Sequence, residues 1–188
     1  MLAIAGPNGA GKTSFFHAHV AASGLRLVNA DRIAAELAVD PYTAASIADR
    51  LRRALVAAGE SFAFETVFSD PVGDKLGFLE ACAAQGHTTA LIFIGLATAG
   101  LSAERVAMRV SQGGHDVPAE RLRARFPRTL TNLRNAIPRL PHVVVFDNSD
   151  LSRPFRLLAS FERGIRVPAP TSPTTRDLPT WFRRLGTC

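Results

Sequence analysis

The chain has 188 residues, of which 47% are hydrophobic and 20% charged, a balance typical of one globular domain with a sizeable core and not of a largely disordered chain. Its formal charge of +6 is by itself weak evidence for a nucleic-acid partner. No apolar run reaches the length of a membrane span, and no basic region precedes an apolar stretch at the N-terminus, so we expect a cytoplasmic protein with no membrane partner.

An apolar run over residues 1–5 opens the chain and predicts a buried strand. It is followed at once by Gly6-Pro-Asn-Gly-Ala-Gly-Lys12-Thr13, which fits the phosphate-loop pattern G-x-x-x-x-G-K-S/T at every fixed position. Residues 13–22 can continue as a helix, so the loop would lie at a helix N-terminus, where unpaired N–H groups and the helix dipole favour an anion. The sequence therefore predicts a nucleotide site.

The residue types of this loop suit phosphate binding better than the alternative, a glycine-rich turn with a surface lysine. Glycines allow the backbone amides to turn inward and the phosphates to approach closely. Lys12 would reach the outer phosphates, and the Thr13 hydroxyl would bind Mg²⁺. We expect the nucleotide-binding residues of the loop to be Gly6, Asn8, Gly9, Ala10, Gly11, Lys12, Thr13 and Ser14.

The next two predicted strands both end in polar residues. Residues 25–28 read as a short strand that ends at Asn29-Ala-Asp31, and Asp31 is well placed to cap a helix over 32–38. A second helix is expected over 42–58. The strand over 61–66 is apolar on both faces, as a central parallel strand should be, and it ends in Glu65 and Thr66.

The second half of the chain is more basic. A helix over 70–85 and a strand over 87–96 lead into a basic helix over 102–112, which Gly113-Gly114 interrupts before a second basic helix over 120–137. Residues 142–146 predict a fifth buried strand, and Asp147-Asn148-Ser149 follow it. We expect a last helix over 151–162, a short edge strand over 165–167 and a loose Pro-rich tail over 168–188.

Strands that alternate with helices predict an α/β domain over residues 1–167, built on a central, mostly parallel sheet of five or six strands. Ligands of such sheets bind outside the carboxyl ends of the strands. The phosphate loop, Asp31, Glu65 and Asp147 all lie at such ends, which is an independent argument for a site there. The two cysteines, Cys82 and Cys188, lie far apart in sequence and are expected to be free thiols.

A phosphate loop used for phosphoryl transfer needs a carboxylate that orients or deprotonates the attacking hydroxyl. Asp31 is the candidate, because it would face the same rim as Lys12, although a simple capping role is equally compatible with its spacing. Glu65 would hold magnesium or accept hydrogen bonds from an acceptor's hydroxyls, with Thr66 as a donor. The alternative is that Glu65 is a surface acid and Thr66 only a good strand residue.

Arginines are concentrated between Glu104 and Arg139, where there are eight of them against three acidic residues. Arg105 and Arg109 lie one helical turn apart and share a face. With Arg125 beyond the double glycine, they predict a basic lid over about residues 100–139 that closes on the nucleotide and stabilises transition-state charge. A solvated helix face is the ordinary alternative for scattered arginines.

Six motifs, taken together and in order, resemble the zeta toxin family of P-loop kinases, in its compact branch. The likeness runs from about residue 1 to residue 165. The motifs are Gly-Pro-Asn-Gly-Ala-Gly-Lys-Thr, Asn29-Ala-Asp31-Arg-Ile, Phe62-Ala-Phe-Glu-Thr66, Arg105-Val-Ala-Met-Arg109-Val, Gly113-Gly-His-Asp-Val-Pro118 and Phe146-Asp-Asn-Ser149.

This resemblance implies a P-loop kinase-like three-layer fold with a basic helical lid. It implies a kinase that uses ATP and Mg²⁺ to phosphorylate the 3′-hydroxyl of the sugar in UDP-N-acetylglucosamine, and a small helical antitoxin protein as a partner. Carried over by motif, it makes Asp31 the catalytic base beside Arg32 in the substrate site. Lys12 and Thr13 would bind the phosphates and the metal. Glu65 would bind the sugar nucleotide and the metal, and Thr66 the sugar nucleotide. The phosphates would be clamped by Arg105, Arg109 and Arg125.

The chain also departs from the family pattern, because the glycine and arginine that often follow the glutamate motif are missing after Glu65-Thr66. The acceptor is therefore open to alternatives. One is a nucleic-acid end, although Phe126 is the one aromatic residue in the basic segment and base stacking is poorly supported. Another is a nucleotide-dependent binding or switch protein without acceptor chemistry.

Overall fold

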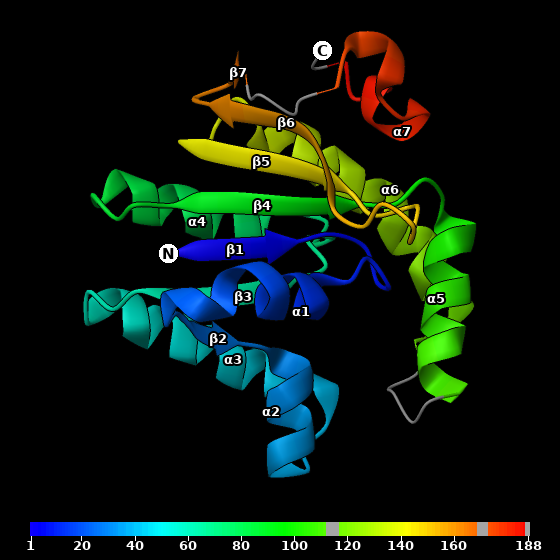
Figure 1. Ribbon diagram of the computed structural model, residues 1–188. Helices are drawn as coiled ribbons and strands as arrows, with labels where there is room; N and C mark the ends of the chain where they lie inside the picture. The colour runs from blue at the N-terminus through cyan, green and yellow to red at the C-terminus, as the bar shows by residue number, and fades with distance from the viewer. Residues whose placement is uncertain (112–116, 169–172, 187–188) are drawn as a thin grey trace.

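The computed structural model describes residues 1–111, 117–168 and 173–186 (Figure 1). Within these residues, one sheet has seven strands in the order β2-β3-β1-β4-β5-β6-β7. The first five are parallel to one another, and β6 and β7 are antiparallel to their neighbours. The strands are β1 (Leu2–Ala5), β2 (Arg26–Val28), β3 (Phe62–Thr66), β4 (Ala90–Gly95), β5 (His142–Asp147), β6 (Arg156–Glu162) and β7 (Ile165–Val167).

Helices cover both faces of the sheet, which confirms the predicted three-layer α/β fold. Packed on one face are α3, α4 and α6, whereas α1 and the π-helical turn that continues it pack on the other, in front of the sheet in Figure 1. The helices are α1 (Lys12–Phe15), continued by Phe16–Val20 and Ala21–Ser23, α2 (Ala30–Leu37), α3 (Pro41–Ala57), α4 (Asp74–Ala84), α5 (Ala99–Ser111), α6 (Ala119–Ala136), a 3₁₀ turn (Thr175–Asp177) and α7 (Thr180–Arg183).

Successive residues of the central strands point to opposite layers, as the pleat of a strand requires. In β1, Ala3 belongs to the core under α3, α4 and α6, and Ile4 belongs to the core under α1. In the neighbouring strand β3, Phe64 and Ala63 divide in the same way, with Ala3 in register with Phe64. Both faces are apolar, so these strands are buried on two sides and their carboxyl ends form one edge.

The sequence-based prediction of a last helix over 151–162 is wrong, since residues 156–162 form strand β6. This strand pairs antiparallel with β5, with Val143 opposite Phe161 and Val145 opposite Ala159. Without β6, the apolar strand β5 would have unpaired backbone groups along one edge, so long-range pairing outweighs local helix propensity. The short edge strand expected over 165–167 is confirmed as β7, and the addition of β6 gives the sheet seven strands instead of the expected five or six.

The expectation of a loose tail after residue 168 is also wrong for the described part of that segment. Leu178, Trp181, Phe182 and Leu185 are buried in the main core, and Phe182 is fully inaccessible to solvent. The Trp181 Nε1 donates a hydrogen bond of 3.0 Å to Asp147 Oδ1 at the end of β5. Apolar residues spaced at i, i+3, i+4 and i+7 therefore pack this segment on the domain.

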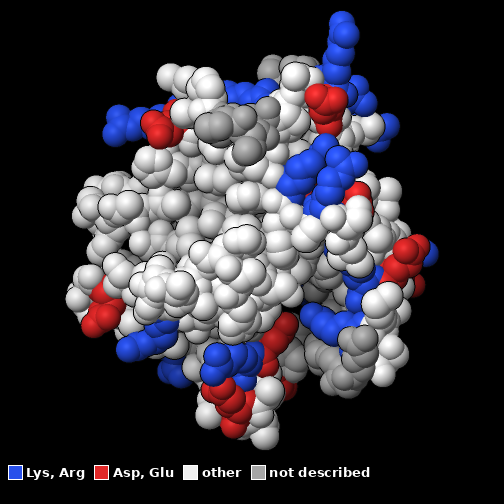
Figure 2. All heavy atoms as spheres, in the orientation of Figure 1, with Lys and Arg blue, Asp and Glu red and all other residues white. Residues whose placement is uncertain are grey.

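Several element boundaries differ modestly from expectation. Helix α4 begins at Asp74 rather than at Asp70, and α3 begins at Pro41 with Asp40 as its N-cap. The double glycine at 113–114, expected to interrupt the two basic helices, lies outside the described residues. None of the helices in the described ranges is long and apolar enough to cross a membrane. On the face shown in Figure 2, charged side chains lie around the edge and form no continuous basic stripe.

Candidate active site

The phosphate loop leaves β1 in a backbone conformation that only glycine adopts easily. Gly6 has φ 147°, and a Cβ atom at this position would lie 2.2 Å from the carbonyl oxygen of Ile94 in β4. At the other end of the loop, Gly11 has φ 87° and its carbonyl accepts the Phe15 N–H at 2.8 Å, which starts α1. The two glycines thus let the loop turn tightly from the sheet into the helix.

Two buried side chains brace the loop from outside. Ser102 Oγ of α5 donates to the Asn8 carbonyl at 2.7 Å, and Asn148 Nδ2, just after β5, donates to the Ala10 carbonyl at 2.9 Å. Asn148 Oδ1 also accepts the Phe155 N–H at 3.2 Å. Both braces satisfy loop carbonyls and so hold the loop in the shape from which backbone amides can face an anion. Neither brace was assigned a role from the sequence.

The Lys12 ammonium group lies over the loop and near two carboxylates. Its Nζ donates to the carbonyls of Gly6 and Pro7, both at 3.1 Å. Burial lowers the pKa of Lys12, while the charges of Glu65 and Asp31 act to raise it and Arg109 acts to lower it further. The charge interactions tie all three of these residues, predicted from separate motifs, to the surroundings of Lys12.

Thr13 and Glu65 meet across the site, from α1 and the end of β3. Thr13 Oγ1 donates to Glu65 Oε2 at 3.0 Å, and Glu65 Oε1 is buried with no hydrogen-bond partner among the described residues. A hydroxyl and a carboxylate with a spare oxygen are hard ligands of the kind that Mg²⁺ takes, with water and phosphate oxygens completing its shell. The pair therefore fits the predicted magnesium site. Thr66, the next residue, accepts the Phe68 N–H at 3.0 Å through its hydroxyl oxygen.

Asp31 does not cap α2, so the capping interpretation of this residue is wrong. The cap is Asn29, whose Oδ1 accepts the N–H groups of Asp31 at 2.8 Å and Arg32 at 3.2 Å. Asp31 is instead in the first turn of the helix, where the helix dipole favours a negative charge. Its carboxylate is exposed and lines the same cavity as Lys12.

Two arginines of α5 line the cavity on the side of the loop. Gly9 lies so close to Arg105 that an added Cβ would be 2.9 Å from the arginine's Cβ. Arg105 Nη2 donates to the Ser149 carbonyl at 3.1 Å, and its Nε is buried without a partner among the described residues. Burial lowers the pKa of Arg105 and Asp147 opposes the effect. Arg109, one turn later, also lines the cavity.

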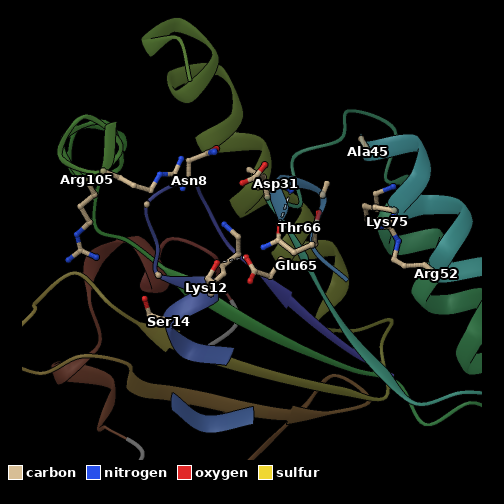
Figure 3. Close-up of a pocket in the computed structure, with 18 residues that line it drawn as sticks. Asn8, Lys12, Ser14, Asp31, Ala45, Arg52, Glu65, Thr66, Lys75 and Arg105 are labelled. Carbon is tan, nitrogen blue, oxygen red and sulfur yellow. Dashed lines mark hydrogen bonds between the residues drawn. The ribbon is translucent and has the colours of Figure 1, made fainter. Parts of the chain in front are cut away.

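The cavity has a volume of about 420 Å³ and gathers most of the predicted site (Figure 3). Gly6 and Ala10 are buried and do not line it. Among the described residues that line the cavity, neither Arg32 nor Arg125 is found. Arg32 pairs with Glu36 on the exposed face of α2, and Arg125 is half-buried on α6. The predicted residues that line it are Asn8, Gly9, Gly11, Lys12, Thr13, Ser14, Asp31, Glu65, Thr66, Arg105 and Arg109.

Two cationic residues that sequence analysis did not single out also line the cavity, Arg52 of α3 and Lys75 of α4. Arg52 lies three residues after Asp49 on a helix, a spacing that indicates an ordinary surface ion pair. Lys75 had a weak signal, since the chain contains just two lysines and the other is Lys12. Their side chains are placed by tertiary packing, which local spacing does not report.

A phosphate loop between the first strand and first helix, with polar side chains at the carboxyl edge of a mostly parallel sheet, defines the fold of a P-loop kinase. No family model and no curated protein matches the sequence. Solved structures with the same fold do match, at sequence identities that show the fold alone.

A chain of the AvrRxo1-ORF1:AvrRxo1-ORF2 complex with ATP matches with a TM-score of 0.71 and 19% identity, over 88% of this chain and 59% of that one. A kinase candidate from Chloroflexus aurantiacus J-10-fl matches with a TM-score of 0.56 and 20% identity, over 81% and 87%. The PezAT toxin–antitoxin system of Streptococcus pneumoniae matches with a TM-score of 0.53 and 14% identity, over 78% and 66%. This chain thus spans less than two thirds of the AvrRxo1 chain.

Proposed function

We propose that the protein is an ATP-dependent phosphotransferase that acts on a hydroxyl group of a small acceptor. The observation that carries the proposal is the position of Asp31. Its carboxylate, relieved of capping by Asn29, lines the same cavity as the phosphate loop. A kinase needs such a carboxylate near the transferred phosphoryl group, whereas a nucleotide switch does not.

In this mechanism, the loop amides, Lys12, Arg105 and Arg109 bind the phosphates of ATP and offset the charge that develops during transfer. The acceptor's hydroxyl oxygen bonds to the γ-phosphorus of ATP, and Asp31 accepts the hydroxyl proton. The bond between the γ-phosphorus and the oxygen that bridges to the β-phosphate breaks, and ADP leaves. Thr13 and Glu65 would hold Mg²⁺, which when bound neutralises phosphate charge. Thr66 would orient the acceptor from the end of β3.

For the acceptor, we propose a sugar nucleotide such as UDP-N-acetylglucosamine, on the strength of the motif resemblance to zeta toxins. A small helical antitoxin is the corresponding partner. Two of the similar structures, the AvrRxo1-ORF1:AvrRxo1-ORF2 complex and the PezAT toxin–antitoxin system, each involve two different proteins, which supports a protein partner for this chain too. The first of these was crystallised with ATP, which supports ATP as the phosphoryl donor.

The test is mass spectrometry of UDP-N-acetylglucosamine after incubation with Mg-ATP and the pure protein, with the Asp31→Asn variant alongside. The wild type should add one phosphate, and Asp31→Asn should slow transfer by about 10²–10⁴-fold, the usual contribution of a general base. ATP affinity of the variant should stay within about twofold, because Asp31 is not part of the loop. Equal transfer by both proteins would remove Asp31 from the mechanism.

A further inference from the structure

Charged residues of α3 and α4 line the cavity on the side away from the phosphate loop. In Figure 3, Arg52 and Lys75 lie across the cavity from Asn8 and Arg105, with Asp31, Glu65 and Thr66 between the two groups. The proposed phosphoryl transfer uses residues on the phosphate-loop side of the cavity and the residues Asp31, Glu65 and Thr66 in its middle. It leaves Arg52 and Lys75 without a role.

The guanidinium group of Arg52 is buried and only partly satisfied. The residue is 5% exposed, and its Cζ lies 5.1 Å from the centre of the Phe64 ring. One of its five N–H donors, on Nη2, bonds to Asp49 Oδ1 at 2.8 Å, while Nε is buried with no partner among the described residues. A buried cation with an unpaired donor costs free energy unless an anion or another acceptor reaches it.

The Asp49 carboxylate accepts hydrogen bonds from three cations. Asp49 Oδ1 accepts from both Arg52 and Lys75, the latter at 3.4 Å, and Asp49 Oδ2 accepts from Arg53 Nε at 2.9 Å. Burial acts to raise the pKa of Asp49, but the hydrogen bonds from Arg53 and Arg52 outweigh it and hold this pKa well below its usual range. Asp49 is thus ionised at neutral pH, and its one negative charge is divided among three cations.

The carboxylates that line the cavity do not pair with Arg52 or Lys75 in any hydrogen bond or ion pair among the described residues. They are Asp31 and Glu65, and both interact with Lys12. Glu65 also accepts a hydrogen bond from Thr13. A ligand that extends from Asp31 toward α3 would contact both Arg52 and Lys75. The planar guanidinium group of Arg52 can donate two parallel hydrogen bonds to phosphate or carboxylate oxygens.

We propose that the acceptor carries an anionic group, a phosphate or a carboxylate, that binds between Arg52 and Lys75 while its hydroxyl group lies at Asp31. This inference rests on the proposed phosphotransferase function and deepens it. Arg52 and Lys75 select anionic acceptors over neutral sugars and alcohols. Ala45 and Ala48 of α3, which line the same side, have side chains small enough to leave space for such a group.

The test uses the full chain saturated with Mg²⁺ and a non-hydrolysable ATP analogue, so that the phosphate loop is occupied. Inorganic phosphate and, separately, acetate are titrated at constant ionic strength, and the dissociation constant is read from the rise in Tm. We expect phosphate, acetate or both to raise Tm. For the anion that raises Tm, Lys75→Gln should increase the dissociation constant at least about tenfold, because a charge-assisted contact is lost.

Arg53→Gln is the matched control, because Arg53 bonds to the same carboxylate yet lies outside the cavity lining. It should change the anion's dissociation constant less than about twofold. Arg52→Lys, which keeps the charge and removes the fork, should weaken phosphate binding as well. If it fails to fold, Lys75→Gln alone decides the question, since Lys75 is near the surface.

The proposal is overturned if neither anion raises Tm of the nucleotide-saturated protein, or if Lys75→Gln and Arg53→Gln alter the response equally. Its fate is separable from that of the proposed function, because anion binding is measured without transfer. Anion binding in a protein that transfers no phosphate would leave the subsite and remove the kinase. Transfer without any anion effect would leave the kinase and remove the subsite.

Discussion

Asp31 is available for chemistry because a residue two positions earlier does the structural work. Asn29 is 8% exposed, and its side chain accepts the two N–H groups that begin α2. Asp31 contributes to the same helix only through its charge in the first turn. The capping role thus belongs to Asn29, and substitutions should separate it from the chemical role proposed for Asp31.

Asn29→Ala should lower the free energy of unfolding by about 1 kcal/mol, the usual loss for an N-cap. Asp31→Asn should cost less, because only a first-turn charge, typically about 0.3–1 kcal/mol, is removed. Urea denaturation of both variants and the wild type measures the two losses. A larger loss for Asp31→Asn than for Asn29→Ala would show that Asp31, not Asn29, holds the helix.

At the residue scale, the sequence predicted what depends on local pattern. Most of the phosphate loop, Asp31 and Glu65 line one cavity, and each was singled out because it belongs to a short motif at a strand end. The sequence pointed to Asp31 as the cap instead of Asn29, because both residue types cap helices and the backbone angles decide between them. Arg52 was missed because its burial against Phe64 depends on how α3 packs on the sheet.

At the scale of elements, the phosphate loop depends on a close contact with β4. Gly6→Ala should shift the loop, because the new Cβ would lie 2.2 Å from the Ile94 carbonyl oxygen at φ 147°. We expect ATP affinity to fall at least about tenfold and stability to drop by about 1–3 kcal/mol, the cost of a strained backbone position. Fluorescence titration with a labelled ATP analogue measures the first, and urea denaturation the second.

Gly77→Ala in α4 is the control for this substitution, because an added Cβ meets nothing within 4 Å. It should leave ATP affinity unchanged and stabilise the helix by up to about 1 kcal/mol. If Gly6→Ala bound ATP as tightly as Gly77→Ala, the loop would not need its contact with β4.

Because Asp49 of α3 is ionised in the folded protein, the free energy of unfolding should depend on pH. The folded-state pKa of Asp49 is depressed, so its stabilising effect is present above the unfolded-state pKa of about 4 and is lost as pH falls below it. Asp49→Asn should therefore be less stable than wild type at pH 7, with the difference shrinking between about pH 5 and pH 2. Urea denaturation across this range measures the difference. A constant difference would contradict the depressed pKa.

Among the elements, the four parallel strands β1, β3, β4 and β5 were predictable because apolar runs of buried strands stand out in sequence. Strand β6 was not, since residues 156–162 lack a clean alternation and their pairing with β5 is decided by contacts across the sheet. Helix α4 began later than expected because Gly73, with φ 76°, lies before it and the chain from Asp70 first makes a turn.

At the scale of the whole molecule, the C-terminal segment is part of the domain and reaches the edge where the site lies. Trp181 fills the space beside Gly95, where an added Cβ would lie 2.1 Å from its ring, and its N–H group holds Asp147. Asp147 also accepts a hydrogen bond from Ser149, whose carbonyl accepts from Arg105. The proline-rich composition hid the helical spacing of the apolar residues in this segment.

Phe182→Ala should destabilise the whole protein by about 3–5 kcal/mol, as expected for truncation of a fully buried phenylalanine. Trp181 is the only tryptophan of the chain, so its fluorescence reports urea unfolding in this variant. Val72→Ala is the control, since Val72 is 79% exposed and its loss should cost less than about 0.5 kcal/mol. Similar stabilities for the two variants would mean that the segment is not part of the core.

The central claim is that this chain transfers phosphate from ATP to a small hydroxyl acceptor with Asp31 as the base. In the most direct measurement, wild-type and Asp31→Asn proteins are each incubated with a small-molecule extract and with Mg-ATP labelled with ¹⁸O in the γ-phosphate. Labelled products are then identified by mass spectrometry. The account predicts a labelled phosphate ester that forms with the wild type and not with the variant over the same time. Labelled inorganic phosphate as the one product, or equal ester formation by both proteins, would contradict it.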